Sequence, residues 1–279
     1  MEVSSHTMPP VTLLCPVRSC HLPLAREERR FVCGNAHAFD VARSGYVNLL
    51  QPQDRRSKNP GDTSEAVQAR RRFLDRGFVD PLVDAIVALL PLREGETLLE
   101  IGCGEGHHLA AFRRAYGVDA HGTDISVPAI ELAARRHRHC SWVVANADRF
   151  LPYAAASFDA AASITARLHA DELARVLAPG GALLVVIPGA DDLLELREAV
   201  LGDRVVRDRV ERTVALFAPH FTLARHQTLR HAAPLDRQAM FDVMASSYRG
   251  LRTRERAVLE SLDPMTVTFS RDALVLRKT

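Results

Sequence analysis

Three cysteines and a histidine near the N-terminus lie at spacings that suit a metal ion. Cys15 and Cys20 have four residues between them, twelve residues follow, and Cys33 and His37 have three residues between them. Four Cys and His ligands in two close pairs are the usual donor set of a tetrahedral Zn²⁺ site. Free thiols with a surface histidine are the alternative, and His21 could compete with Cys20 as a ligand. We expect one zinc ion to join two turns of a segment too short to be stable alone.

A glycine-rich segment, EIGCGEG at residues 100–106, follows an apolar stretch and precedes a helical pattern. Glycines let a backbone turn sharply against a ligand, and a helix N-terminus offers free N–H groups. The dinucleotide fingerprint G-x-G-x-x-G fails because His107 occupies its last position. Asp124, which ends the next predicted strand, can accept both hydroxyls of a ribose. The segment therefore predicts a nucleoside ligand, with a plain turn as the alternative.

The pattern E-x-G-x-G-x-G resembles the first motif of class I S-adenosylmethionine methyltransferases. This resemblance implies S-adenosylmethionine as the cofactor. It places Ile125 against the adenine and the end of the third strand near the adenine amino group. For Asp148 a helix cap or a solvated loop residue is the alternative. The residues expected to contact the cofactor are Glu100, Gly102, Cys103, Gly104, Glu105, Gly106, Asp124, Ile125, Asn146, Ala147 and Asp148. The side chains of Cys103 and Cys140 are expected to serve packing.

Alternating strand and helix patterns from residue 62 onward predict an α/β domain with a parallel sheet. One helix is expected to start at Asp62, with Glu65 completing a capping box, and a second to follow Pro81. A helix is also expected from Leu235. The turn Pro179-Gly180-Gly181 should precede the fifth strand. Strands are expected at 97–102, 118–124, 141–146, 158–164, 182–188, 221–230 and 265–277.

Composition agrees with a globular protein. Of the 279 residues, 47% are hydrophobic and 25% charged. No apolar run approaches the roughly 20 residues of a membrane span, and the first residues lack a secretory signal, so a cytoplasmic location is expected. Five cysteines there favour metal binding or free thiols over disulfides. Residues 1–76 hold twelve Lys or Arg against eight Asp or Glu, a charge of +4 that could face nucleic acid or simply solvent.

Over nearly its whole length the chain resembles the bacterial 23S ribosomal RNA guanine-N1-methyltransferases. The likeness is carried by the cysteine cluster, the glycine loop and the segments FDVARSGYVNLL (39–50), RSKNPGD (56–62) and QARRRFLDRG (68–77). It implies a zinc-ribbon-like module that helps to grip an rRNA hairpin, and a dimer. It also implies a Rossmann-like class I domain with a mostly parallel seven-stranded sheet. We expect a zinc module at 1–50, a linker with lead-in helices at 51–92 and a methyltransferase domain at 93–279.

The chain departs from the family pattern at four places, all expected near the catalytic cleft. Phe78 and Val79 replace a His-Tyr pair, and Ser163-Ile164-Thr165-Ala166-Arg167-Leu168 replaces an aromatic-Ala-Pro turn. Asp192 replaces a histidine that contacts the cofactor; it is a candidate cofactor contact or base, or a helix cap. Ala245-Ser246-Ser247-Tyr248-Arg249 replaces a Thr-Pro-aromatic segment, and Tyr248 could stack on a base or pack in the core.

These features predict an S-adenosylmethionine-dependent methyltransferase that acts on 23S rRNA at guanine N1, with no catalytic residue assigned. A small-molecule methyltransferase with a structural zinc site and a zinc-containing RNA-binding protein without catalysis are the alternatives. Guanine N1 carries a proton, so a base or a hydrogen-bonding partner would help. The candidate contacts to RNA phosphates are Arg26, Arg29, Arg30, Arg43, Arg55, Arg56 and Lys58.

Overall fold

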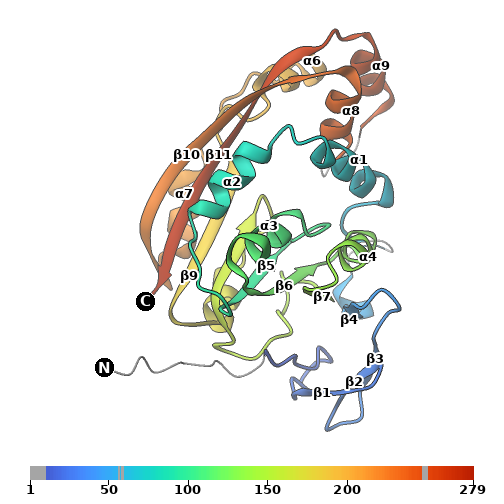
Figure 1. Cartoon of the computed structure of the whole chain (residues 1–279), viewed down its shortest axis with the longest axis vertical. Coiled ribbons are helices and arrows are strands. Elements are labelled where there is room, and N and C mark those ends of the chain that lie inside the picture. The colour runs from blue at the N-terminus through green and yellow to red at the C-terminus, as the bar shows by residue number, and fades with distance from the viewer. Residues whose placement is uncertain (1–10, 56, 58–59, 247–250) are drawn as a thin grey trace.

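The protein consists of one large sheet with helices on both faces and one small sheet. The computed structural model describes residues 11–55, 57, 60–246 and 251–279. Over these residues the large sheet has the strand order β10-β11-β9-β8-β5-β6-β7-β4 (Figure 1). Its strands are β4 (Val47–Asn48), β5 (Thr97–Ile101), β6 (Asp119–Asp124), β7 (Ser141–Val144), β8 (Phe158–Ile164), β9 (Leu177–Pro188), β10 (Phe221–Leu235) and β11 (Met265–Lys278).

Most of the large sheet is parallel. Strands β7, β6, β5, β8 and β9 pair in parallel, whereas β11 is antiparallel to both β9 and β10. This confirms the predicted Rossmann-like class. The expected seven strands become eight in the described chain, because Val47 and Asn48 pair in parallel with Val143 and Val144. A two-residue strand has no periodicity, so the sequence pattern could not reveal it.

Helices pack on both faces of the large sheet, which therefore has two apolar cores. Successive residues of β5 face opposite sides, so Leu98 belongs to one core and Leu99 to the other. The first core also receives side chains from α1 (Ser64–Asp75), α2 (Asp80–Ala88), α3 (His107–Tyr116), α4 (Val127–Arg136), α6 (Leu194–Leu201), α8 (Arg237–Ala245) and α9 (Thr253–Ser261). The second receives them from α5 (Ala170–Val176) and α7 (Val210–Phe217).

The N-terminal module, here residues 11–50, packs against the second core. Its small antiparallel sheet is formed by β1 (Leu24–Glu27), β2 (Arg30–Cys33) and β3 (Ala38–Asp40). The Leu14 N–H donates to the Pro152 carbonyl at 2.9 Å, and the Ala154 N–H donates to the Thr12 carbonyl at 3.0 Å. These bonds and the β4–β7 pairing fix the module to the large sheet.

Helix α1 begins one residue later than predicted and without the capping box. Thr63 is the N-cap, and its hydroxyl accepts from the Ala66 N–H at 3.2 Å. The expected cap, Asp62, instead pairs with Arg70 at 2.7 Å. The sequence pattern cannot show whether the Asp62 side chain caps the helix or pairs with Arg70.

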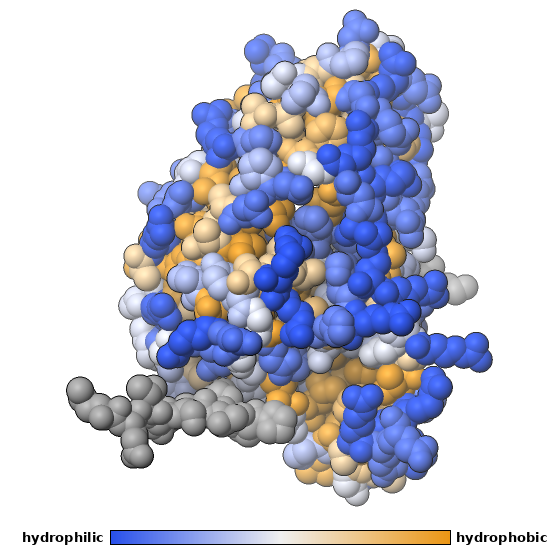
Figure 2. Space-filling view, viewed as in Figure 1, coloured by the Kyte–Doolittle hydropathy of each residue, from blue (hydrophilic) through white to orange (hydrophobic). Residues whose placement is uncertain are grey.

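The basic residues of α1 hold it to α8 as well as covering the surface. Arg72 Nη2 lies 2.6 Å from Oδ1 of Asp242, whose side chain is only 1% exposed. Arg76 pairs with Asp236 at 2.6 Å. The outer surface over α1 and α4 is nonetheless mainly hydrophilic (Figure 2).

Other boundaries differ from the prediction, most of them by one or two residues; β7, for example, ends at Val144 rather than at residue 146. Strand β9 begins at Leu177 and includes the expected turn, where a register irregularity and the φ of +72° at Gly180 mark a local bend. Strand β10 continues to Leu235 because β11 pairs with it along its whole length. Helix α8 accordingly begins at Arg237, after the N-cap Asp236. A 3₁₀ helix at Pro52–Asp54 lies within the expected linker.

Candidate functional site

The four predicted metal ligands meet in one cluster. The ligand atoms of Cys15, Cys20, Cys33 and His37 all lie within 4.8 Å of one another. Nδ1 of His37 is 3.4 Å from both the Cys15 and the Cys33 sulfur, and the Cys20 and Cys33 sulfurs are 3.8 Å apart. A tetrahedron with Zn–S bonds of about 2.3 Å has S···S edges of about 3.8 Å. The donor set and its spacing therefore fit a zinc ion.

Tight turns position these four ligands, and a separate contact keeps the alternative ligand His21 away from them. The Cys20 N–H donates to the Val17 carbonyl at 3.0 Å, and the Ala36 N–H donates to the Cys33 carbonyl at 2.9 Å. His21 points elsewhere, because its ring stacks on Phe150 with centroids 4.3 Å apart. The choice between Cys20 and His21 thus required the tertiary structure.

The glycine loop connects the buried strand β5 to the N-terminus of α3. Gly102, Gly104 and Gly106 all have positive φ values. A Cβ on Gly102 would lie 2.4 Å from the Cβ of Ala166, so the turn after β8 lies directly against the loop. The intervening Cys103 side chain is buried in the first core, and burial raises the pKa of its thiol well above the ordinary value. Cys103 could therefore reach a ligand only through its backbone.

Asp124 joins the end of β6 to this loop. Its carboxylate accepts from the Gly104 N–H at 3.0 Å and from the Ser126 N–H at 2.7 Å. Burial raises the pKa of Asp124, and the two N–H donors act against that shift. Each carboxylate oxygen retains a free acceptor position, which suits the adjacent hydroxyls of a ribose.

Two more carboxylates lie around the same loop. Glu100 is 2% exposed, and its Oε2 has no hydrogen-bond partner. Burial, and next the charge of Glu105, raise the pKa of Glu100 well above its ordinary value. Burial likewise raises the pKa of Glu105, which Arg70 opposes. A buried acceptor without a donor fits a ligand that brings a positive charge or N–H groups.

The lead-in segment covers the loop, a feature that the sequence interpretation missed. Arg70 of α1 pairs with Asp62 at 2.7 Å, lies 4.0 Å from Glu105 and donates to the Ser246 carbonyl at 2.9 Å. Ser126 Oγ donates to the Asp62 carbonyl at 2.7 Å. Arg70 thus links α1, the glycine loop and the end of α8. The only available signal was its place in the QARRRFLDRG segment.

Other predicted contacts cluster at the end of β7. The Asn146 side-chain amide donates to the Asp54 carbonyl at 2.8 Å, and its oxygen accepts from the Asp148 N–H at 3.1 Å. Asp148 lies in a partly exposed turn, where it pairs with Arg167 at 3.2 Å, and it caps no helix of the described chain. Ala147, also at the end of β7, packs against the second core, whereas Ile125, which follows β6, packs against the first.

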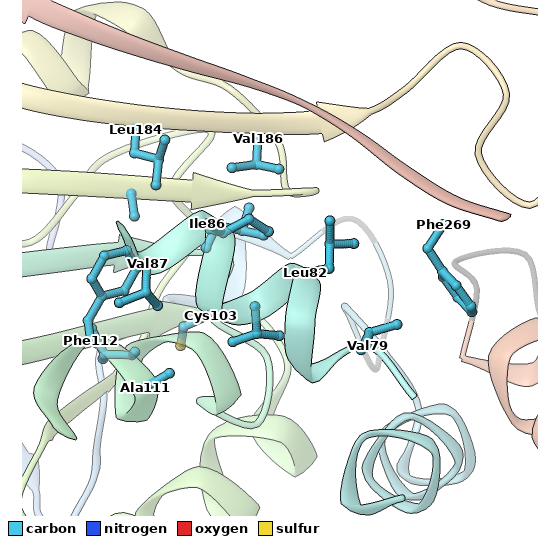
Figure 3. Close-up of a cluster of buried hydrophobic side chains, with 14 of the residues drawn as sticks. Val79, Leu82, Ile86, Val87, Cys103, Ala111, Phe112, Leu184, Val186 and Phe269 are labelled. Atoms are coloured by element: carbon cyan, nitrogen blue, oxygen red, sulfur yellow. The ribbon is translucent and has the colours of Figure 1, made fainter. Parts of the chain in front are cut away.

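The structure shows what several of the residues that depart from the family pattern contact. Val79 is buried at the start of α2 and packs in the first core (Figure 3). Phe78 stacks on Phe73 with centroids 5.4 Å apart. Asp192 accepts from the Ser270 N–H at 2.9 Å and pairs with Arg271. It does not cap α6, whose N-cap is Leu193.

Ser246 is the C-cap of α8. Ser247, Tyr248 and Arg249 lie outside the described residues, as do Arg56 and Lys58.

Comparisons with known proteins identify the family to which this chain belongs. A zinc-ribbon family described as "RlmA, N-terminal" matches residues 13–58, and a methyltransferase domain family matches residues 98–181. The 23S rRNA (guanine(748)-N(1))-methyltransferase of Streptomyces fradiae is 39% identical over 84% of this chain and 83% of that protein. The chain belongs to the 23S rRNA (guanine-N1)-methyltransferase family.

Further relatives agree. A candidate 23S rRNA (guanine-N1)-methyltransferase of Micromonospora griseorubida is 33% identical over 92% of this chain and 94% of that protein. A crystal structure of a candidate methyltransferase from Bacillus halodurans superposes with a TM-score of 0.52 at 15% identity, over 70% of this chain and 97% of that one. The last comparison shows the class I methyltransferase fold. The protein is therefore an S-adenosylmethionine-dependent methyltransferase with a zinc ribbon.

Proposed function

We propose that this protein transfers a methyl group from S-adenosylmethionine to N1 of a guanine in 23S rRNA. One observation carries the proposal: a zinc cluster and a glycine loop of this family's type are attached to the same sheet. The zinc ribbon adds exposed arginines, among them Arg26, Arg29 and Arg43, to an otherwise ordinary methyltransferase domain. An RNA substrate accounts for both parts, because phosphates need cations and the base needs the methyl donor.

The glycine loop and its neighbours would hold the cofactor. We assign the ribose hydroxyls to Asp124 and the loop contacts to Glu100, Glu105 and the backbone of residues 102–106. Ile125 would lie against the adenine, whose amino group would meet the Asn146-Ala147-Asp148 stretch. When bound, S-adenosylmethionine supplies an electrophilic methyl group on a positively charged sulfur. The partnerless oxygen of Glu100 is an acceptor for the positive end of that molecule.

The protein's main catalytic task would be alignment. The S–CH₃ bond breaks as the N1–CH₃ bond forms, and the N1 proton leaves to solvent or to a base. Holding the guanine in line with the methyl group can lower the barrier by roughly 7–11 kcal/mol. Asp192 is held by Arg271 and Ser270, so we propose that it fixes the cleft wall rather than accepts the proton.

The proposal also covers the domain bounds, the oligomeric state and the contacts to RNA phosphates. We propose a module at 1–50, a lead-in segment at 51–92 and a methyltransferase domain at 93–279, acting as a homodimer in the cytoplasm. No helix of the described chain is long and apolar enough to cross a bilayer. Of the proposed phosphate contacts, Arg30 already pairs with Glu27 at 2.8 Å and Arg26 lies over the Phe31 ring.

The test is transfer of tritium from labelled S-adenosylmethionine to protein-free large-subunit rRNA, followed by nucleoside analysis. Labelled 1-methylguanosine is the expected product. Label in another nucleoside would overturn the acceptor but keep the enzyme class. No label in RNA, with cofactor binding intact, would favour a small-molecule acceptor or an RNA-binding protein without catalysis.

A further inference from the structure

A cavity lies at the junction of the N-terminal module and the large sheet, and none of its lining residues belongs to the glycine loop. Its volume is about 250 Å³. The turn before β4 contributes Arg43 and Ser44 to its lining, the α4–β7 connection contributes Arg138 and Cys140, and β7 contributes Trp142. Two different parts of the protein therefore form one pocket. In the space-filling view the module at the bottom shows both hydrophobic and hydrophilic residues, the latter mainly on its right side (Figure 2).

The two arginines of the cavity have no partners. Neither Arg43 nor Arg138 forms an ion pair or hydrogen bond with any part of the chain that the structure describes, and both are exposed. Their neighbours on α4 differ, because Arg135 pairs with Glu131 at 2.6 Å. Glu131 also accepts from Ser44 Oγ at 2.9 Å, so this carboxylate is already engaged. The cavity thus presents two free guanidinium groups.

Two guanidinium groups around one cavity are complementary to a phosphate. Each can donate two parallel N–H bonds to phosphate oxygens, which an ammonium group cannot do. Trp142 also lines the cavity, although its side chain is almost fully buried.

The position of the cavity relative to the glycine loop indicates which phosphate could bind there. The cavity opens near the first residues of β7, whereas the glycine loop follows the last residue of β5, at the opposite end of the parallel strands. Four residues of β7 span roughly 13 Å. S-adenosylmethionine carries no phosphate, and no residue of the glycine loop lines the cavity. A phosphate bound here would therefore come from a part of the RNA away from the reacting base. A polyanion that extends along the molecule can reach both places.

We propose that this cavity binds a phosphodiester of the RNA substrate, distant from the methylated nucleotide. The inference rests on the proposed function for the identity of the RNA. It assigns a role to Arg138, which sequence reasoning had not considered, and gives Arg43 a defined partner. RNA would then contact the module and the methyltransferase domain at once.

The test compares the double variant R43A/R138A with R212A. Arg212 lies on α7 beside β10, at the opposite edge of the sheet, and it is likewise exposed and without a partner in the described chain. Filter binding measures the Kd for a large-subunit rRNA fragment over a range of salt. We expect roughly tenfold weaker binding and a salt slope reduced by about one in the double variant only. Calorimetry should give an unchanged Kd for S-adenosylmethionine, which shows that the variant is folded.

Activity and inorganic phosphate supply further readouts. In methylation assays the KM for RNA should rise in the double variant while kcat changes little. Trp142 is the only tryptophan in the chain, so its fluorescence reports on the cavity. Inorganic phosphate should alter it in the wild type but not in the double variant, and RNA should compete.

Wild-type RNA affinity and salt slope in the double variant would overturn the phosphodiester site, even if the wild type methylates guanine. Phosphate binding that RNA does not displace would also overturn it, in favour of a small-anion site. Conversely, an intact RNA-binding effect with no methyl transfer would overturn only the proposed function.

Discussion

Gly106 offers the sharpest test of how the glycine loop is built. It has a φ of +81°, and a Cβ there would lie 2.3 Å from Cη2 of Trp142. Carbon atoms attract best at about 3.5–4.0 Å, so the contact is strongly repulsive. Trp142 is buried, and its six-membered ring also lies against Gly122, so a movement away from Gly106 would disturb a second contact.

The magnitude for Gly106→Ala can be separated into two parts. A left-handed φ costs a non-glycine residue about 1–2 kcal/mol, of which reduced unfolded-state entropy returns about 0.4–1. Overpacking against the indole adds about 1–3 kcal/mol. We therefore expect a loss of about 2–4 kcal/mol in the free energy of unfolding. The displaced loop should also bind S-adenosylmethionine at least about tenfold more weakly, because its N–H groups no longer aim at the ligand.

Gly202→Ala is the matched control. Gly202 has a φ of +66°, but no atom lies within 4 Å of its added Cβ. It should therefore lose only the backbone part, about 1 kcal/mol or less, and keep its cofactor affinity. Urea unfolding and calorimetry measure both quantities. If Gly106→Ala is no less stable than Gly202→Ala, the claimed contact with Trp142 is wrong.

Three other predictions follow from the same geometry. Asp124→Ala should weaken S-adenosylmethionine binding at least about a hundredfold by calorimetry, because two charged hydrogen bonds of about 1.5–3 kcal/mol each are lost. Asp119→Ala, at the other end of β6, should leave the affinity unchanged. Equal affinities of the two variants would refute the assignment of Asp124 to the ribose. Cys33→Ser should abolish bound zinc by elemental analysis and expose the N-terminal module to protease, whereas Cys140→Ser should retain the metal; zinc retained in the first variant would contradict the ligand set. Burial lowers the pKa of His137 from 6.5 to about 4. As the pH falls from 6.5 to 4, the imidazole therefore binds a proton in the unfolded chain but not in the folded one, and the free energy of unfolding decreases. The wild type should lose about 2 kcal/mol more than His137→Gln between pH 7 and pH 5 in urea unfolding, and parallel losses would exclude His137 as the cause.

Some features could be predicted because they are local. The spacing of Cys15, Cys20, Cys33 and His37 indicates zinc before any fold is known, since each pair needs only one turn. The glycine loop and Asp124 are positioned by one strand-loop-helix-strand unit, whose periodicities are readable. The class of fold follows from that alternation.

Features that join distant segments depended on the tertiary structure. The pairing of residues 47–48 with β7, the exclusion of His21 by Phe150 and the placement of Arg70 over the glycine loop all join residues that no sequence window contains together. The same is true of Arg43 and Arg138, whose shared cavity exists only once the module is attached to the sheet. Spacing along the chain thus determined which ions and cofactors this protein binds. Long-range packing decided which charged side chains remain free to meet an RNA, because an arginine is available only where no carboxylate from another element has reached it.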